Sequence, residues 1–191
     1  MSIDTTTPSE RPLRADARRN RERIMEAARA VFARQGGEAQ IDDIARAAGV
    51  GVGTVYRHFP HKEALLGELL VEHFRKMADN AELALEVEDP WEAFAGLLRT
   101  NGRFCAADIG VQQALARGPE AWEYAAPEID RLRDSSTKLI VRAQRAGVMR
   151  EDFVVDDIPM LMAGLSSTMA VPGYDWRRHL EIILAGIRAT A

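Results

Sequence analysis

Cysteine and long apolar segments are nearly or wholly absent from this sequence of 191 residues. Cys105 is the single cysteine, so the chain can form neither an internal disulfide nor a cysteine-based zinc site. No apolar run approaches the ~20 residues that a membrane-spanning helix needs, and residues 1–10 lack the apolar stretch of a secretory signal. We therefore expect a cytoplasmic protein in a reducing compartment, with no membrane partner.

Patterns that predict β-strands or enzyme chemistry are also missing. No segment alternates apolar and polar residues convincingly, which predicts an all-α fold. There is no Gly-rich phosphate loop, no HExxH motif and no pair of nucleophile and base. The four histidines have no metal-ligand spacing, and Pro60 breaks any helix between His58 and His61. The sequence therefore predicts no metal and no cofactor, and an enzyme is the least supported class of protein.

Charge is unevenly distributed along the chain, although the net charge of -4 alone argues against a nucleic-acid partner. Residues 1–62 hold 11 Lys and Arg against 8 Asp and Glu, a net of +3, whereas the remaining residues hold 14 against 21, a net of -7. A basic segment joined to an acidic body is expected when only one part of a protein meets phosphate. An accidental gradient is the alternative, because a net charge of +3 is small.

Composition and apolar spacing divide the chain into three predicted parts. Residues 1–15 are polar and contain two prolines, so we expect a disordered basic arm there. Residues 16–62 hold three predicted helices, which we expect to form a small head. Residues 63–191 form a larger helical body.

The segment from Ile41 to Phe59 meets three requirements of a helix-turn-helix together. Two helices that cross closely need a small residue on the first, and Ala45 supplies it. The turn needs a residue that tolerates positive φ, and Gly49 supplies that four residues later. Val55 then anchors the second helix on its inner face. The alternative is a pair of ordinary short helices in a bundle, with their aromatic side chains in the core.

The second helix of such a motif enters the major groove of DNA by its N-terminal end. Arg57 could read a guanine or hold a phosphate, Val52 could touch only a thymine methyl, and Thr54 could bond to either a base or a phosphate. Tyr56 and His58 would contact the backbone and fix the register. The predicted DNA contacts are Arg18, Gln40, Gly51, Val52, Gly53, Thr54, Tyr56, Arg57, His58 and Lys62.

Glycines and cations near the second helix favour the same interpretation. Gly51 and Gly53 allow close approach of the backbone, and Lys62 adds a cation at the start of the next helix. Six arginines crowd the chain from Arg11 to Arg23. We expect one or two of them to contact phosphate or the minor groove, although a merely solvated face is the alternative.

The residues from Arg23 to Leu66 resemble the N-terminal domain of the TetR family of bacterial regulators. The resemblance lies in IMEAARAVFARQG at 24–36, IARAAGV at 44–50 and GTVYRHFPHKEAL at 53–65. It implies a DNA-binding domain of three helices with a helix-turn-helix at residues 16–62, a ligand-binding and dimerisation domain at residues 63–191, and a homodimer on a palindromic operator.

The same resemblance implies backbone contacts from the positions that match Thr54, Tyr56, His58 and Lys62. Two positions depart from the family pattern. Gln40 stands where the family usually has Ser or Thr ahead of the second helix, and Gly51 stands where Ser or Thr often opens the recognition helix. Both departures remove polar contacts, so the operator sequence does not follow from the resemblance.

The rest of the sequence predicts helices separated by prolines and glycines. These are a long helix from about His61 to Leu85, helices at 91–105, 158–170 and 175–190, and a short segment at 111–116. A further long helix opens at Pro119, is interrupted or restarted at Pro127 and ends at Gly147. We expect Asp156-Asp157 to cap the helix at 158–170.

A regulator needs a sensor, but no motif in the body identifies a ligand. Pockets between bundle helices are mostly apolar with a few polar anchors, so large apolar and aromatic side chains are the candidate walls. The alternative for each is an ordinary place in the core, and Cys105 is expected there as a small buried hydrophobe. The candidates are His73, Met77, Trp91, Phe94, Leu98, Phe104, Trp122, Tyr124 and Met162.

The last two helices carry enough apolar surface to form an isologous four-helix interface between two subunits. A dimer would place two recognition helices about one DNA turn apart, ~34 Å. We therefore predict a repressor that an unknown small-molecule effector releases from a palindromic double-stranded operator. A regulator that needs no ligand and an activator are the alternatives that stay open.

Overall fold

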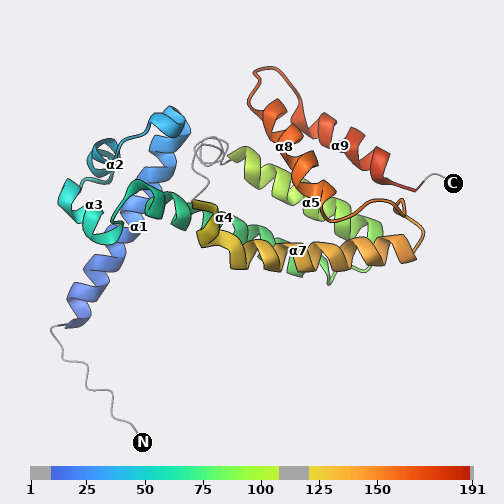
Figure 1. Cartoon of the computed structure of the whole chain (residues 1–191), viewed down its shortest axis with the longest axis horizontal. Coiled ribbons are helices and arrows are strands. Elements are labelled where there is room, and N and C mark those ends of the chain that lie inside the picture. The colour runs from blue at the N-terminus through green and yellow to red at the C-terminus, as the bar shows by residue number, and fades with distance from the viewer. Residues whose placement is uncertain (1–9, 108–120, 190–191) are drawn as a thin grey trace, which may run out of the picture.

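The chain is helical, with no β-strand, across the residues that the computed structural model describes, 10–107 and 121–189. The all-α prediction is confirmed. In chain order the elements are α1 (Glu10–Gln35), the 3₁₀ turn η1 (Gly36–Glu38), α2 (Ile41–Ala48), α3 (Val52–His58), α4 (Lys62–Ala84), α5 (Pro90–Ala107), α7 (Trp122–Arg145), α8 (Asp157–Met169) and α9 (Trp176–Ile187). Figure 1 shows α1, α2 and α3 gathered into a head at one end, with α4 leading from it into a helical body.

Two glycines set the helix ends of the head, and the sequence predicted the turn at Gly49. Gly36 has a φ of 56° and follows the last residue of α1, and Gly49 has a φ of 64° and ends α2. Only glycine adopts this left-handed conformation without a steric cost. The chain therefore turns sharply at both points, and α2 packs against α1 while α3 packs against α2.

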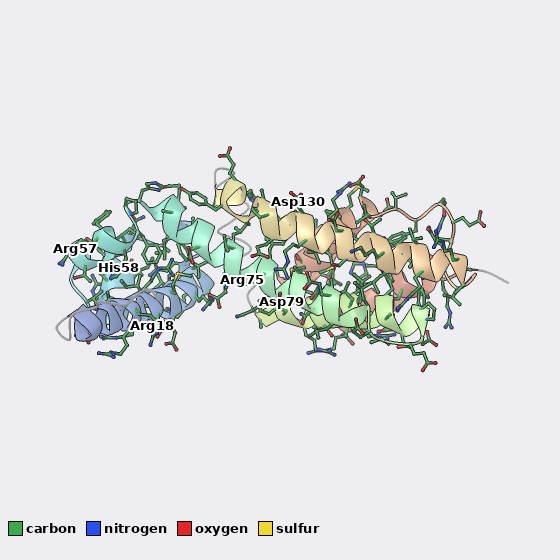
Figure 2. All side chains as sticks on the ribbon, turned by 90° about the horizontal axis from the view of Figure 1, so that it is seen from below. Arg18, Arg57, His58, Arg75, Asp79 and Asp130 are labelled. Atoms are coloured by element: carbon green, nitrogen blue, oxygen red, sulfur yellow. The ribbon has the colours of Figure 1, made fainter. Side chains whose placement is uncertain are left out.

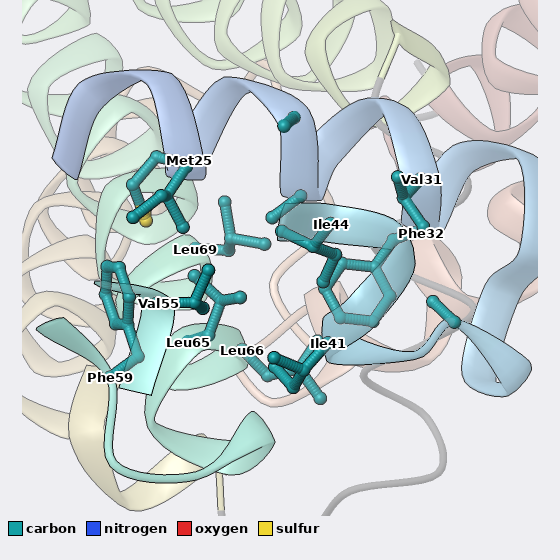
Figure 3. Close-up of a cluster of buried hydrophobic side chains, with 14 of the residues drawn as sticks. Met25, Val31, Phe32, Ile41, Ile44, Val55, Phe59, Leu65, Leu66 and Leu69 are labelled. Carbon is teal, nitrogen blue, oxygen red and sulfur yellow. The ribbon is translucent and has the colours of Figure 1, made fainter. Parts of the chain in front are cut away.

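The head has a hydrophobic core of its own (Figure 3). Phe32 from α1, Ile44 from α2 and Val55 from α3 are each completely buried. Leu65 and Leu69, on the first turns of α4, close the core from the other side. Burial of each large side chain contributes roughly 1.5–3 kcal/mol, so this core holds the inner face of α3 firmly while its opposite face stays at the surface.

Helices α4 and α7 run side by side in the same direction and join the head to the body (Figure 1). Arg131 of α7 donates hydrogen bonds to Asp79 at 3.0 Å and Glu82 at 2.9 Å on α4, and to Glu128 at 2.6 Å within α7. Arg142 of α7 donates to the Leu85 carbonyl at the end of α4, at 2.8 Å. These bonds fix the register of the C-terminal part of α4 against α7.

The body has a second core, formed mainly by α5, α7, α8 and α9. Phe94, Leu139 and Leu165 are completely buried in it. Arg99 of α5 reaches both carboxylate oxygens of Glu181 on α9, at 2.8 and 3.0 Å, which ties those helices together on the surface. Among the described helices, none is long and apolar enough to cross a membrane.

The first helix begins earlier than the sequence predicted. Residues 10–15, expected in the disordered arm, are the first residues of α1. Pro12 is the third residue of this helix, where the backbone N–H has no partner within the helix, so proline costs little there. The rest of the predicted arm, residues 1–9, lies outside the described residues.

Two further helix predictions are wrong in detail. α7 continues through Pro127 without a break, because only the hydrogen bond to the carbonyl of residue 123 is lost, and Glu123 lies at the exposed surface. The Asp156 side chain does not cap α8; it pairs with Arg133 of α7 at 2.6 Å instead. The short segment predicted at 111–116 lies outside the described residues.

Candidate DNA interface

The turn between α2 and α3 has the geometry that a helix-turn-helix requires. The Gly49 N–H donates to the Ala45 and Arg46 carbonyls, which closes the end of α2. Ala45 is 1% exposed, so this small residue is buried in the packed head. The Arg23 guanidinium donates to the Ala48 carbonyl at 2.6 Å, so an arginine of α1 also locks this turn.

The outer face of α3, which we call the α3 face, consists of Gly51, Val52, Gly53, Thr54, Tyr56 and Arg57. Val52 is 36% exposed and Tyr56 49% exposed. Arg57 donates from Nε to the Gly53 carbonyl at 3.2 Å and from Nη2 to Thr54 Oγ1 at 3.4 Å. Its guanidinium therefore lies along the helix, beside Gly53 and Thr54.

A shallow depression beside the α3 face is lined by Gln40, Ile41, Asp42, Tyr56, Pro60, His61 and Lys62. The first turns of α2 and α4 meet there, and helix N-termini attract anions. His61 Nδ1 accepts the Ala64 N–H at 3.1 Å, which caps α4. The Gln40 side chain makes no cap for α2 and donates to the Glu38 carbonyl at 2.9 Å. The lining of the depression thus includes three side chains with hydrogen-bond donors, those of Gln40, Tyr56 and Lys62, and one exposed carboxylate, that of Asp42.

Lys62 is bound within the head and does not extend freely into solvent. Its ammonium donates to the Gly37 carbonyl at 2.7 Å and lies 5.8 Å from the centre of the Phe32 ring. The contact joins the start of α4 to the turn after α1. Sequence reasoning missed it, because Gly37 and Lys62 are 25 residues apart and no local pattern relates them.

The arginines of α1 divide between two roles. Arg21 pairs with Glu68 of α4 at 2.9 Å and lies 5.2 Å from the centre of the Phe59 ring, so it stabilises the head, as Arg23 does. Arg18 is exposed and its nearest ionic partner is Glu22, one turn away at 3.6 Å. Figure 2 shows Arg18, Arg57 and His58 at the end of the molecule that is distant from the body.

The nine predicted pocket residues are distributed over several parts of the body. His73 stacks on Phe104 with ring centres 4.8 Å apart. The centre of the Trp122 ring lies 5.6 Å from the centre of the Phe74 ring. Tyr124 is 50% exposed and packs against α4 at Gly67. Met77 is buried on α4, and Trp91 and Phe94 belong to the second core.

Leu98 and Met162, the remaining two candidates, line a narrow apolar hollow between α5, α8 and α9. Cys105 is buried as expected, with Sγ 4.0 Å from His73 Nε2. No group of three or more His, Cys, Asp or Glu side chains suited to a metal ion occurs in residues 10–107 and 121–189.

Comparison with known proteins assigns the head and the body to one family. Residues 24–69 match the family described as "Bacterial regulatory proteins, tetR family", and residues 89–189 match "Transcriptional regulator SbtR-like, C-terminal domain". A TetR transcription regulatory protein from Mycobacterium vanbaalenii is 37% identical, with 93% of this chain and 100% of that chain covered and a TM-score of 0.64. The chain belongs to the TetR family.

Two further proteins are similar to this chain, one over part of its sequence and one in its fold. An HTH-type transcriptional regulator of Staphylococcus aureus is 35% identical over 83 residues, which are 39% of this chain and 45% of that protein. The chain thus matches less than half the length of this curated relative. The Bacillus subtilis regulator FadR, solved in complex with stearoyl-CoA, has the same fold at 20% identity, with a TM-score of 0.68 over 86% of this chain and 95% of that chain.

Proposed function

We propose that this TetR-family protein represses transcription by binding a palindromic DNA operator, and that a small-molecule effector releases it. The main support for this proposal is the α3 face, which is exposed at the end of the head while the opposite side of α3 is held in the core. A helix of this kind fits the major groove of B-DNA. In this proposal the protein acts by binding, without catalysis, in the bacterial cytoplasm where its operator lies.

We assign the contacts of the head by the chemistry of each side chain. Thr54, Tyr56 and His58 would donate to phosphates on either side of the groove and fix the register of α3. Gln40 and Arg18 would add phosphate contacts from α2 and α1. Lys62 would act mainly through the Gly37 carbonyl, which it holds, and so would position the turn before α2 next to the DNA.

A second copy of the chain is the proposed occupant of the outer face of α8 and α9. α8 has 13 residues, yet Leu165 is its single buried side chain. Met160 is 66% exposed and Ile182 on α9 is 56% exposed. Exposed Gly164 and Gly186 leave room for helices to approach closely. An apolar helix pair left this open in one subunit suits an isologous four-helix interface.

The start of α7 connects the proposed ligand-binding body to the head. Ala121 and Ala125 are completely buried in the head core, together with residues of α1 and α2. The Tyr124 side chain packs directly on Gly67, where an added Cβ would lie 2.6 Å from Tyr124 Cδ2. An effector that displaced α7 would therefore displace α4 and α1 with it.

Charged contacts strengthen this connection between α1 and α4. Glu72 of α4 accepts hydrogen bonds from Arg29 of α1 and lies 3.1 Å from Lys76. Burial alone would raise the pKa of the Glu72 carboxyl, but the bonds from Lys76 and Arg29 outweigh it and hold that pKa below its ordinary value of 4.5.

The stearoyl-CoA complex of FadR, which has this fold, supports a small organic effector in the body.

DNA binding by purified full-length protein tests the proposal. Labelled duplexes covering the intergenic DNA beside its gene are titrated at about 0.15 M salt, and fluorescence anisotropy is measured. We expect saturable binding at nanomolar concentration, tighter by ~10³-fold or more than binding to scrambled duplexes of equal length. Equal affinity for the scrambled duplexes would contradict a sequence-specific regulator.

A further inference from the structure

Gly53 is a glycine that the folded head does not require. Its φ is not positive, unlike that of Gly49, so the backbone there is open to any L residue. A Cβ built on Gly53 has no atom within 4 Å. At Gly49, in contrast, the φ is 64° and an added Cβ would lie 2.9 Å from Arg23 Nη2. Turn geometry explains Gly49, but neither geometry nor packing explains Gly53.

The same glycine weakens the helix that contains it. Gly53 lies inside α3, a helix of seven residues, and glycine is among the least favourable residues at such a position, whereas alanine is the most favourable. α3 also begins after Gly51, which offers no side-chain cap. The head would therefore be more stable with alanine at position 53, and the reason for glycine lies outside the folded chain.

Arg57 and Thr54, the neighbours of Gly53 on the α3 face, indicate which part of a DNA partner would come close to it. Arg57 is one helical turn further along the same face and is bonded to the Gly53 carbonyl at 3.2 Å. Thr54 Oγ1 lies 3.4 Å from the Arg57 guanidinium. Residues separated by four positions share one face of a helix, so a DNA surface that contacts the Arg57 guanidinium at this place would also lie close to Gly53.

We propose that Gly53 is a specificity-determining residue: the floor of the operator's major groove comes into van der Waals contact with the backbone of α3 at this position. The missing side chain lets α3 lie deep enough for the outer N–H groups of Arg57 to reach a base edge. Arg57 then reads a guanine through two parallel hydrogen bonds, and does not simply hold a phosphate. This inference rests on the proposed DNA-binding function and deepens it.

Gly53→Ala separates a role in binding from a role in folding. The variant fills empty space in the free protein and improves the helix, so we expect its Tm to rise by roughly 2–4 °C. The added methyl group would lift α3 from the groove floor. We expect its Kd for the strongest operator recovered from the genome to increase by about 10- to 100-fold, with its Kd for random duplex unchanged within about twofold, because phosphate contacts dominate that binding.

Gly96→Ala is the matched control. Gly96 lies inside α5 in the body, and an added Cβ there also has no atom within 4 Å. This variant should gain stability in the same way and bind the operator like the wild type. An operator Kd for Gly53→Ala within tenfold of wild type, or a Tm below wild type, would overturn the inference while the proposed function stands. A wild-type protein that binds no operator would overturn both.

Discussion

Arg57 holds most of the hydrogen-bond donors on the α3 face. Val52 has no donor, Thr54 has one hydroxyl, and the two glycines have no side chain. The Arg57 guanidinium is held in place by the Gly53 carbonyl and Thr54 Oγ1 before any DNA arrives. A side chain ordered in advance loses less entropy on binding, so this residue should contribute more to recognition than its neighbours.

Arg57→Ala tests that role. A bidentate contact to guanine contributes roughly 1–3 kcal/mol of discrimination, so we expect an operator Kd about 10- to 100-fold weaker than wild type. Discrimination should be lost at a single base pair of each half-site. Anisotropy titrations against a set of operators with single base-pair changes measure both effects.

Arg103→Ala is the control for the change of charge, because Arg103 is exposed on α5 in the body. It should leave both affinity and base preference unchanged. Uniform weakening by Arg57→Ala across all the operators would instead assign Arg57 to a phosphate.

Individual residues differ in how well their positions could be predicted from the sequence. Ala45, Gly49 and Val55 have the places that were predicted, because their requirements follow from spacing along one short motif. The bonds that Lys62 and Arg23 make were not predicted, because each joins a carbonyl 25 residues away, at Gly37 and Ala48. Such contacts depend on the packed arrangement of three helices, which local spacing does not specify.

At the scale of helices, the contact between α4 and α7 is unusually close at Gly67. An added Cβ there would lie 2.6 Å from Cδ2, 2.7 Å from Cγ and 3.1 Å from Cβ of Tyr124. The ring is half exposed and can rotate, but its Cβ is fixed to the backbone of α7. A side chain at position 67 must therefore push the two helices apart.

Gly67→Ala should destabilise the protein. Overpacking costs about 1–3 kcal/mol, and the gain in helix propensity offsets ~1 kcal/mol of it. We expect a Tm roughly 2–4 °C below wild type, measured by circular dichroism. In a protein that already carries Tyr124→Ala, adding Gly67→Ala should lower Tm much less than it does in the wild type. Equal losses in both backgrounds would show that Tyr124 is not the obstacle.

Glu72 gives the contact between α1 and α4 a predicted pH dependence. Its carboxyl has a lowered pKa in the folded protein, so the stabilisation is present above the ordinary pKa of 4.5 and is lost as the pH falls through the folded value. Glu72→Gln should therefore lower Tm more at pH 7 than near pH 3. Glu123→Gln, at an exposed site on α7, should give no comparable loss at pH 7. A Glu72→Gln deficit that is the same at both pH values would contradict this assignment.

Sequence predicted some helix boundaries well and others poorly, for physical reasons. α2 ends where predicted because Gly49 ends it locally. α5 begins within one residue of its predicted start because Pro90 favours a helix start there. Pro127 is a strong local signal too, yet α7 passes through it, since contacts with α4 along its length compensate for one lost hydrogen bond. Trp122 and Tyr124 were predicted as pocket walls from their size, but their exposure depends on where α7 begins relative to the head.

At the scale of the whole molecule, the proposed dimer interface on the outer face of α8 and α9 can be tested by substitution. Ile182→Glu would place a charge in the proposed interface, where leaving it unpaired is costly. We expect a monomer by analytical ultracentrifugation at micromolar concentration. Its operator Kd should be weaker by roughly 100-fold or more, because the two heads are no longer linked.

Leu83→Glu is the matched control for that variant. Leu83 is 69% exposed near the end of α4, so it presents as much apolar surface but lies outside the proposed interface. It should remain a dimer with unchanged operator affinity. Dimers of Ile182→Glu as stable as those of the wild type would place the interface elsewhere.

The central claim, that two α3 faces of a dimer read one symmetric operator, is tested most directly by sequencing the genomic DNA fragments that the purified protein retains at about 0.15 M salt. We predict enrichment of a palindromic motif whose half-site centres are separated by about 10 base pairs or a multiple of one DNA turn. We also predict that its conserved bases include a guanine whose recognition is lost with Arg57→Ala. Retention of fragments with no shared motif, or of a motif without two-fold symmetry, would contradict the account.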